Sequence, residues 1–156
     1  MTVVGVDPGK TGAAVCYYPC GGVSIARRSK LTPIDWVREL VSMIEYADLI
    51  VVEKVASSPQ MGVKSAYSFG HEVGIIHGAC YAMHTPIVEV TPQKWQPAVG
   101  VHPKKGEPQP AHKLRLKQRA QELFPREKIT ADLADALLIA HYAMTVELPK
   151  HRGKAV

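Results

Sequence analysis

Two short apolar runs in this sequence each end in a carboxylate. Val3–Asp7 reads VVGVD and Leu49–Glu53 reads LIVVE, so both have the length and the β-branched side chains of a buried strand. A carboxylate at the end of such a strand leaves the core where the sheet meets solvent. If the two strands are neighbours, Asp7 and Glu53 lie close together at one edge of the sheet.

The segments around these runs predict a mixed α/β fold. Residues 12–18 and Val23–Arg27 read as strands on either side of a turn at 19–22, which gives the chain an antiparallel start. Thr32 and Pro33 open a helix with a capping hydroxyl and a proline in its first turn. Further elements are expected at residues 64–83 (helix), 86–91 (strand), 112–124 (basic helix) and 130–145 (helix). We expect one domain over residues 1–148 and a flexible basic tail at 149–156.

The helix expected at residues 64–83 has two distinct lines of small and apolar side chains. The first line recurs in steps of three and four and predicts a core face: Ala66, Phe69, Val73, Ile76, Cys80, Met83. The second line is Gly70, Gly74 and Gly78, four residues apart. Each glycine costs a helix about 1 kcal/mol relative to alanine. The glycines therefore predict a close approach, either by the sheet of the same chain or by a partner subunit.

The last expected helix contains a second pair of carboxylates. Asp132 and Asp135 are three residues apart on one face of a helix that is apolar on nearly all sides. Two buried like charges repel and lose hydration, and a divalent cation offsets both costs. The alternative is that these residues only interact with the positive amino-terminal end of the helix dipole. Together with Asp7 and Glu53 they favour Mg²⁺ or Mn²⁺, because the donors are hard oxygens.

The positive charge of the chain is concentrated in one segment. Residues 102–119 contain six Lys or Arg and one acid, and so account for the whole formal net charge of +5. This pattern favours a nucleic-acid partner, although a solvated helix face would have the same composition. No apolar run approaches the ~20 residues of a membrane span. Without a secretory signal, Cys16, Cys20 and Cys80 are expected to be reduced thiols in the cytoplasm.

The segment GVDPGKTG superficially resembles a phosphate-binding loop. The motif G-x-x-x-x-G-K-[ST] needs a glycine at position 4, where the chain has Val4. The aspartate would also face the phosphates. A sugar-kinase fold with a similar loop needs two domains, for which 156 residues leave no room. We therefore expect no nucleotide cofactor.

Three segments together resemble a known family. GVDPG, VVEKV and DLADALLIA, in this order, are similar to the acidic motifs of the RuvC-type Holliday-junction resolvases, which belong to the RNase H-like superfamily. The resemblance implies a mixed five-stranded sheet flanked by helices. It also implies a homodimeric endonuclease that cuts four-way DNA junctions by paired symmetric nicks, leaving 5′-phosphate and 3′-hydroxyl ends. The implied catalytic metal ligands, for Mg²⁺ with Mn²⁺ as a substitute, are Asp7, Glu53, Asp132 and Asp135.

The resemblance also suggests DNA contacts. Lys113 matches the family's basic residue near the scissile phosphate, and Lys94 approximates another with a register one position uncertain. The basic segment adds further candidates: Lys104, Lys105, Arg115, Lys117. Many bacterial members have a base-stacking aromatic where this chain has Ala56, and Tyr67 is our candidate to replace it because Phe69 fits the core face better.

Departures from the family pattern leave more than one substrate and more than one host compatible with the sequence. The loop at 102–110 is longer than in typical bacterial members, which indicates a divergent or phage-encoded resolvase in the cytoplasm of a bacterium or an infected host. An RNase H-like nuclease for RNA or for other branched DNA stays an alternative. A purely architectural DNA-binding protein is disfavoured by the four intact acids.

Overall fold

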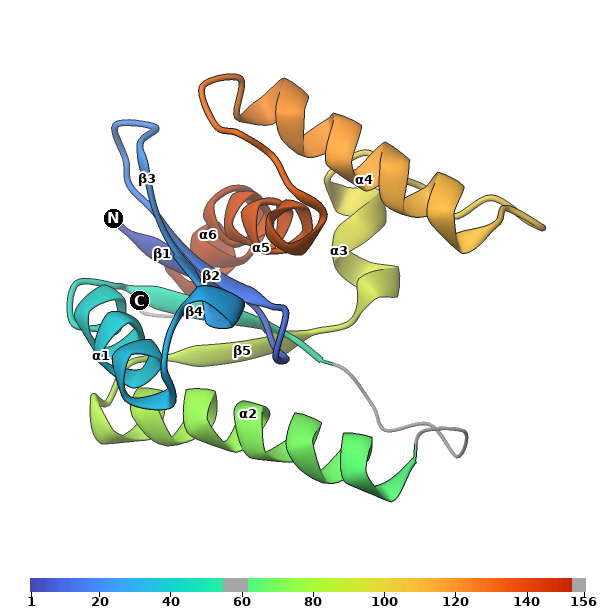
Figure 1. Ribbon diagram of the computed structural model, residues 1–156. Coiled ribbons are helices and arrows are strands. Elements are labelled where there is room, and N and C mark those ends of the chain that lie inside the picture. Colours follow the sequence, from blue (N-terminus) through green and yellow to red (C-terminus); the bar gives the residue numbers. More distant parts are fainter. Residues whose placement is uncertain (55–61, 153–156) are drawn as a thin grey trace.

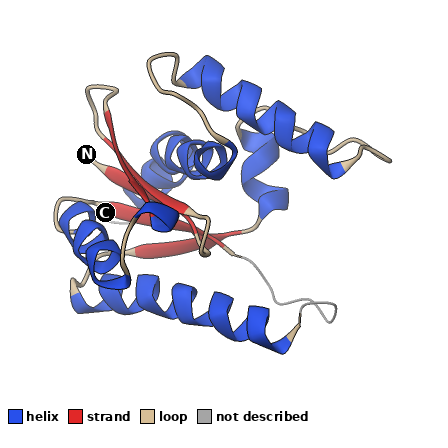
Figure 2. Cartoon of the chain, viewed as in Figure 1, coloured by secondary structure: helices blue, strands red, loops and turns tan. Residues whose placement is uncertain are grey.

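The computed structural model describes residues 1–54 and 62–152, and these contain one five-stranded sheet. Strands β1 (Val3–Asp7), β2 (Ala13–Tyr17) and β3 (Val23–Arg27) are antiparallel, whereas β4 (Leu49–Glu53) and β5 (Ile87–Val90) continue the sheet in parallel with β1. The strand order is β3-β2-β1-β4-β5, so β1 and β4 are neighbours. Figure 2 shows this sheet between helices on both faces.

The helices form two layers around the sheet (Figure 1). One layer contains α1 (Pro33–Ile44) and α2 (Val63–Ala82). The other contains four helices: α3 (Pro92–Ala98), α4 (Gln109–Leu123), α5 (Ala131–Tyr142) and α6 (Leu148–Arg152). A short 3₁₀ turn, Arg28–Lys30, follows β3, and a π-helical turn, Ala143–Glu147, joins α5 to α6. Thr32 caps α1 as expected, because its side chain accepts a hydrogen bond from the Asp35 amide.

Side chains along the central strands point alternately to the two faces of the sheet, and they form one hydrophobic core on each face. Val3 and Val51 face the core beneath α5, whereas Val4 and Val52 face the core beneath α1 and α2. Since side chains two residues apart point to the same face of a strand, Asp7 and Glu53 belong to the α5 side. The alternation therefore decides which helix the two carboxylates meet.

Helix α5 lies unusually close to β1 at Gly5. A Cβ atom built on Gly5 would lie 2.2 Å from the backbone nitrogen of Ala140 and 2.8 Å from the carbonyl oxygen of Ala136. Real Cβ atoms do not approach backbone this closely, so only glycine fits at this position. The contact sets the depth at which the amino-terminal end of α5 reaches the sheet edge.

Helix α2 has the predicted core face in part, since Ile76 and Cys80 are buried as expected. Its most buried side chains are Glu72, Ile76 and Cys80, whereas Phe69 is only partly buried and belongs to neither core. Glu72 is 3% exposed and accepts two hydrogen bonds from Arg28, of 2.7 and 2.8 Å. A buried carboxylate of this kind is tolerated only when it is paired. The ion pair therefore fixes the rotation of α2 against the sheet.

The glycine line on α2 meets no other part of the described chain. A Cβ atom built on Gly70, Gly74 or Gly78 would find nothing within 4 Å. The sheet of the same chain therefore does not explain these glycines. The prediction of a close approach by the sheet was wrong, and the prediction of a partner subunit stays a prediction.

Two further segments depart from expectation. The seven-residue helix α3 was not predicted, and α4 begins three residues earlier than expected, at Gln109. Helix α6 continues to Arg152, so part of the segment expected to be a flexible tail is helical. Within residues 1–54 and 62–152, no helix combines the length and the apolarity that a membrane crossing needs.

Candidate functional site

Three carboxylates meet at one edge of the sheet, and we call Asp7, Glu53 and Asp135 the acid cluster. Strands β1 and β4 pair in parallel with Val6 opposite Val52, so Asp7 and Glu53 emerge side by side and lie within hydrogen-bonding reach of each other. The close packing of α5 on Gly5 brings Asp135 to the same point from above. The sequence predicted this meeting of two strand ends and one helix.

Burial and mutual repulsion make the acid cluster reluctant to ionise. Burial, followed by the charges of Asp135 and Glu53, raises the pKa of Asp7 from 3.8 to about 8, although Lys113 acts in the opposite direction. Burial and the charge of Asp135 also raise the pKa of Glu53. Such raised pKa values mark a site that needs positive charge from elsewhere.

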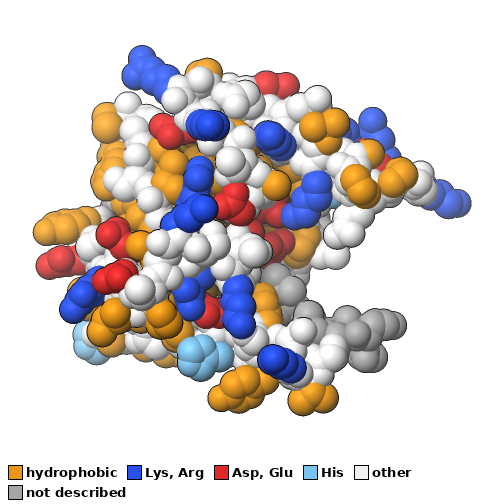
Figure 3. Space-filling view, in the orientation of Figure 1, with side chains coloured by type: hydrophobic (Ala, Val, Ile, Leu, Met, Phe, Trp, Pro, Cys, Tyr) orange, Lys and Arg blue, Asp and Glu red, His pale blue; other side chains and the backbone are white. Residues whose placement is uncertain are grey.

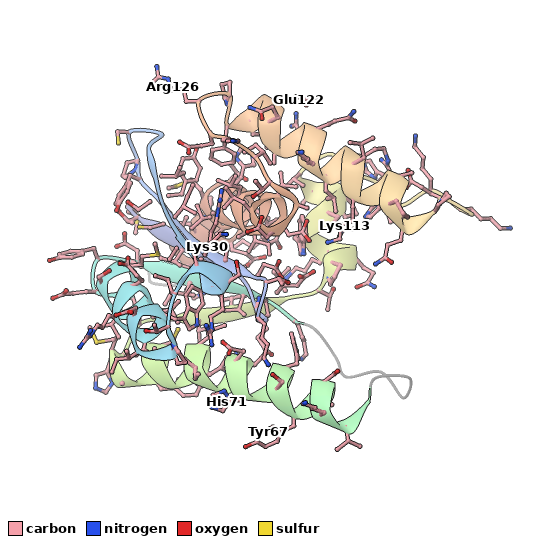
Figure 4. The ribbon with its side chains drawn as sticks, in the orientation of Figure 1. Lys30, Tyr67, His71, Lys113, Glu122 and Arg126 are labelled. Carbon is pink, nitrogen blue, oxygen red and sulfur yellow. The ribbon has the colours of Figure 1, made fainter. Side chains whose placement is uncertain are left out.

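Lys113 supplies part of that positive charge. Its ammonium group donates a hydrogen bond to Oδ2 of Asp135, and its side chain is about half exposed. Burial alone would lower the pKa of Lys113, but the hydrogen bond to Asp135 and the charges of the acid cluster outweigh it and raise this pKa. Figure 4 shows Lys113 on the side of α4 that faces α5.

One oxygen of the acid cluster has no partner among the described residues. Oδ1 of Asp135 is buried without any hydrogen bond, and the Asp135 side chain as a whole is only 6% exposed. An unpartnered buried carboxylate oxygen is costly, so this atom indicates a place where a further positive group fits.

Asp132 is not part of the acid cluster. Its Oδ2 lies 4.0 Å from Nε of Arg27 at the end of β3, and its charge is not among those that raise the pKa of Asp7. In residues 1–54 and 62–152, no three His, Cys, Asp or Glu side chains are already arranged to hold a metal ion. The structure therefore brings together three of the four predicted carboxylates.

Sequence reasoning missed Trp95, which supports the acid cluster from α3. The indole of Trp95 is fully buried, and its Nε1 donates a hydrogen bond of 3.3 Å to Oε1 of Glu53. A buried tryptophan needs an acceptor for its N–H group. That requirement was the available signal, but the acceptor cannot be read from the sequence.

Two of the predicted DNA-contacting residues are engaged within the protein. The ammonium nitrogen of Lys94 lies 3.3 Å from the buried carboxylate of Glu147. Arg115 donates hydrogen bonds to both oxygens of Glu107 and to the carbonyl of His102, so it holds the 102–108 loop against α4. In this structure, both side chains therefore bind other residues of the same chain.

The other predicted contacts remain open to solvent. Lys104, Lys105 and Lys117 are exposed on the loop before α4 and on α4 itself. Tyr67 is 78% exposed and lies on the outer side of α2, pointing away from the sheet (Figure 4). Position 56 lies outside the described residues. In Figure 3, acidic side chains gather at the inner end of the hollow between α4 and α2, with Lys and Arg around them.

The chain is similar in fold to several solved structures, although its sequence gives no match. No protein-family model matches the chain, and no curated protein matches its sequence. Among solved structures, the chain is similar to Thermus thermophilus RuvC in complex with a Holliday junction substrate, with a TM-score of 0.63 and 18% identity over 94% of this chain and 96% of that one.

The chain has the fold of the RuvC-type resolvases. A second Thermus thermophilus RuvC structure aligns with a TM-score of 0.59 and 19% identity, over 92% of this chain and 96% of that one. The Fowlpox virus resolvase, solved with its substrate Holliday junction DNA, aligns with a TM-score of 0.51 and 14% identity over 91% and 97%. The predicted RNase H-like architecture, a mixed five-stranded sheet flanked by helices, is confirmed. The RuvC-like fold places the acid cluster on β1, β4 and α5.

Proposed function

We propose that this protein is an endonuclease that resolves four-way DNA junctions by paired symmetric nicks. The observation that carries the proposal is the acid cluster, in which β1, β4 and α5 of a RuvC-like fold present three mutually repelling carboxylates. The similar structures suggest the substrate class, because both the Thermus thermophilus and the Fowlpox virus proteins were solved with Holliday junctions. The proposed place of action is the cytoplasm of a bacterium or of a phage-infected host.

The acid cluster fits a hard divalent cation, Mg²⁺ with Mn²⁺ as a substitute. Asp7, Glu53 and Asp135 offer only oxygen donors, and the buried Oδ1 of Asp135 has no partner in the described chain. We assign these three residues as ligands and keep Asp132 as a fourth, which would have to leave Arg27. A bound ion would supply Lewis-acid activation of water and charge neutralisation at the phosphate.

Two further side chains of the site, Trp95 and Lys113, are proposed to orient a carboxylate and to neutralise charge. Trp95 holds one oxygen of Glu53, so the carboxylate keeps one orientation. Lys113 stands where a substrate phosphate would approach and can exchange Asp135 for a phosphate oxygen. In the reaction, water adds to phosphorus and the bond from phosphorus to the 3′ oxygen breaks, so one product keeps the phosphate on its 5′ end and the other gains a 3′ hydroxyl.

A nicking assay on a synthetic mobile four-way junction tests the proposal. We expect symmetric nicks with Mg²⁺ or Mn²⁺, no nicks with a chelator, and products that a ligase reseals. A matched duplex of RNA, treated in parallel, tests the alternative of an RNA-processing nuclease. Preferential cutting of the RNA, or cutting that a chelator leaves unchanged, contradicts the proposal.

The Lys113→Ala variant is expected to bind the junction more weakly and with less sensitivity to salt. Removing one phosphate contact lowers the slope of log affinity against log salt concentration by about 0.9. The matched control is Lys128→Ala, which removes an exposed lysine from the loop between α4 and α5. Titrations with a fluorescent junction over a range of NaCl concentrations give both slopes. An unchanged slope for Lys113→Ala would remove this residue from the DNA-contacting set.

We further propose that the protein acts as a homodimer through the outer face of α2. Val63, Tyr67 and Tyr81 are exposed on this helix, and the three glycines between them leave its backbone bare. A four-way junction has two-fold symmetry, so two symmetric nicks are most simply made by a symmetric pair of subunits.

The Gly74→Arg variant is expected to be a folded monomer. Nothing lies within 4 Å of a Cβ atom at Gly74, so the arginine does not disturb the subunit but does separate two helices that meet there. Sedimentation at micromolar concentration measures the state, and a thermal melt confirms that the variant is folded. A wild-type monomer, or a dimeric Gly74→Arg variant, contradicts this interface.

A further inference from the structure

A cavity of about 440 Å³ begins at Pro8, the residue that follows Asp7 of the acid cluster, and none of the three acids lines it. One wall is the turn that follows Asp7, from Pro8 to Thr11. The opposite wall is the beginning of α2, with Phe69 at its inner end. Phe69 packs near Gly9, where an added Cβ would lie 3.8 Å from the ring. The aromatic ring therefore lines this cavity.

The cavity is positively charged and rich in hydroxyl groups. Its lining includes no acid, and it contains Lys10, Lys64 and three hydroxyl side chains: Thr11, Ser65, Ser68. Among the described residues, neither lysine has a carboxylate within 4.0 Å, whereas several other basic side chains are paired. Two unpaired ammonium groups beside hydroxyl donors form a suitable environment for a phosphate group.

The position of the cavity relates it to the acid cluster. Lys10 follows Asp7 by only three residues, so the two Cα atoms are at most about 11 Å apart. Helices α4 and α2 lie on opposite sides of the sheet (Figure 1), so the lysines of α4 and Lys64 at the start of α2 approach its strand ends from opposite sides. A DNA strand passing over the acid cluster would therefore meet positive charge on both sides.

We propose that this cavity is a second phosphate site, which binds a phosphodiester neighbouring the scissile one. The inference rests on the proposed nuclease function and adds the path of the strand to it. Lys10 and Lys64 neutralise the phosphate, the hydroxyl groups donate hydrogen bonds to its oxygens, and Phe69 packs against the adjoining sugar. The site positions the strand and takes no part in bond breaking.

The first experiment measures salt dependence in the double variant Lys10→Gln/Lys64→Gln. With Ca²⁺ in place of Mg²⁺ to prevent cutting, the slope of log affinity against log salt concentration is expected to fall by about 0.7 to 0.9, because the double variant no longer neutralises one phosphate. Arg126→Gln removes the same kind of charge at the far end of α4 (Figure 4) and is expected to leave the slope unchanged. Both positions are exposed, so thermal melts should match the wild type.

The second experiment locates the phosphate. Junctions with a single uncharged methylphosphonate at successive positions around the cut are titrated against the wild type and the double variant. At one position next to the cut, the wild type is expected to lose about tenfold in affinity and the double variant nothing further, since both changes remove the same contact. Equal losses for the two proteins at every position, or an unchanged salt slope, overturn the inference.

Two controls separate this inference from neighbouring explanations. A wild type that neither binds nor cuts the junction refutes the proposed function itself, whereas a wild type that does both while the double variant behaves identically refutes only the second phosphate site. Inorganic phosphate is titrated as a competitor. Competition with the junction that disappears in the double variant supports the assignment, whereas phosphate binding that needs both lysines but leaves junction affinity unchanged would show a site for free phosphate and would overturn it.

Discussion

The Asp7→Asn variant is expected to lose at least about a thousandfold in junction cleavage while keeping the junction affinity of the wild type. Asp7 interacts electrostatically with both Glu53 and Asp135, so an amide at this position removes the charge of the proposed central metal ligand. The basic side chains on α4 and beside the β1–β2 turn are untouched, and these carry the proposed DNA binding. Nicking rates with Mg²⁺ and binding titrations with Ca²⁺ measure the two effects separately.

Asp48→Asn is the matched control for this variant. Asp48 precedes β4 at the opposite edge of the sheet, where its carboxylate accepts a hydrogen bond of 2.7 Å from the Thr2 amide. An asparagine still offers a carbonyl oxygen at this place, so cleavage is expected to stay at the wild-type rate. Wild-type cleavage by Asp7→Asn would remove Asp7 from the catalytic centre. Loss of junction binding by the same variant would show that Asp7 acts mainly in folding or recognition.

The raised pKa of Asp7 adds a thermodynamic signature to the same substitution. Between the ordinary pKa of 3.8 and the folded value of about 8, the folded chain keeps a proton that the unfolded chain has released. The free energy of unfolding of the metal-free protein therefore declines as pH rises through this window, by up to about 1.4 kcal/mol per pH unit. Asp7→Asn is expected to flatten this decline and to melt above the wild type at pH 8. Parallel melting profiles of the two proteins with pH would contradict the repulsion within the acid cluster.

The Gly5→Ala variant is expected to be destabilised by about 4 kcal/mol or more, a large share of the roughly 5–15 kcal/mol that stabilises a typical domain. The added methyl group would lie 2.2 Å from the backbone nitrogen of Ala140, and backbone atoms cannot move aside as a flexible side chain can. Helix α5 would have to leave the sheet, taking Asp135 with it. The far-ultraviolet circular dichroism signal, followed through a urea titration, measures the loss.

Gly70→Ala is the matched control for Gly5→Ala. Within the subunit its Cβ would meet nothing within 4 Å, and alanine is the better helix former, so at protein concentrations below those of the proposed dimer the variant is expected to be as stable as the wild type or more stable by up to about 1 kcal/mol. A Gly5→Ala variant that unfolds at the urea concentration of the wild type would show that α5 is free to shift. In that case, the position of Asp135 would not depend on this contact.

The sequence predicted the strands of the site well because their signals are local. Val3–Asp7 and Leu49–Glu53 are short apolar runs whose bounds match the observed strands, and their parallel pairing follows from the RNase H-like order of elements. The meeting of Asp7 and Glu53 needs nothing beyond that pairing. The role of these acids as metal ligands stays a prediction.

The features of the site that could not be predicted from the sequence depend on how the helices are rotated and packed against the sheet. The spacing of Asp132 and Asp135 puts both near one face of α5, but the contact at Gly5 and the position of Arg27 direct only Asp135 to the acid cluster. On α2, the apolar period correctly placed Ile76 and Cys80 in the core. Phe69 is only partly buried, because the ion pair between Glu72 and Arg28 also determines how the helix is rotated. Helix α3 has only seven residues with Pro97 inside it, too few for a periodic pattern.

The contact between Gly5 and α5 also bears on how a chain of this kind can change over evolutionary time. Asp7 has a proposed role in the chemistry and its loss is expected to leave the fold intact, whereas Gly5 serves the fold and leaves no room for a side chain. A lineage that gives up cleavage and keeps only DNA binding would therefore be free to replace the aspartate but would retain the glycine two positions before it. Among distant sequences of this architecture, a protein that has lost nuclease activity is therefore expected to keep the glycine that corresponds to Gly5 and to lack the aspartate that corresponds to Asp7.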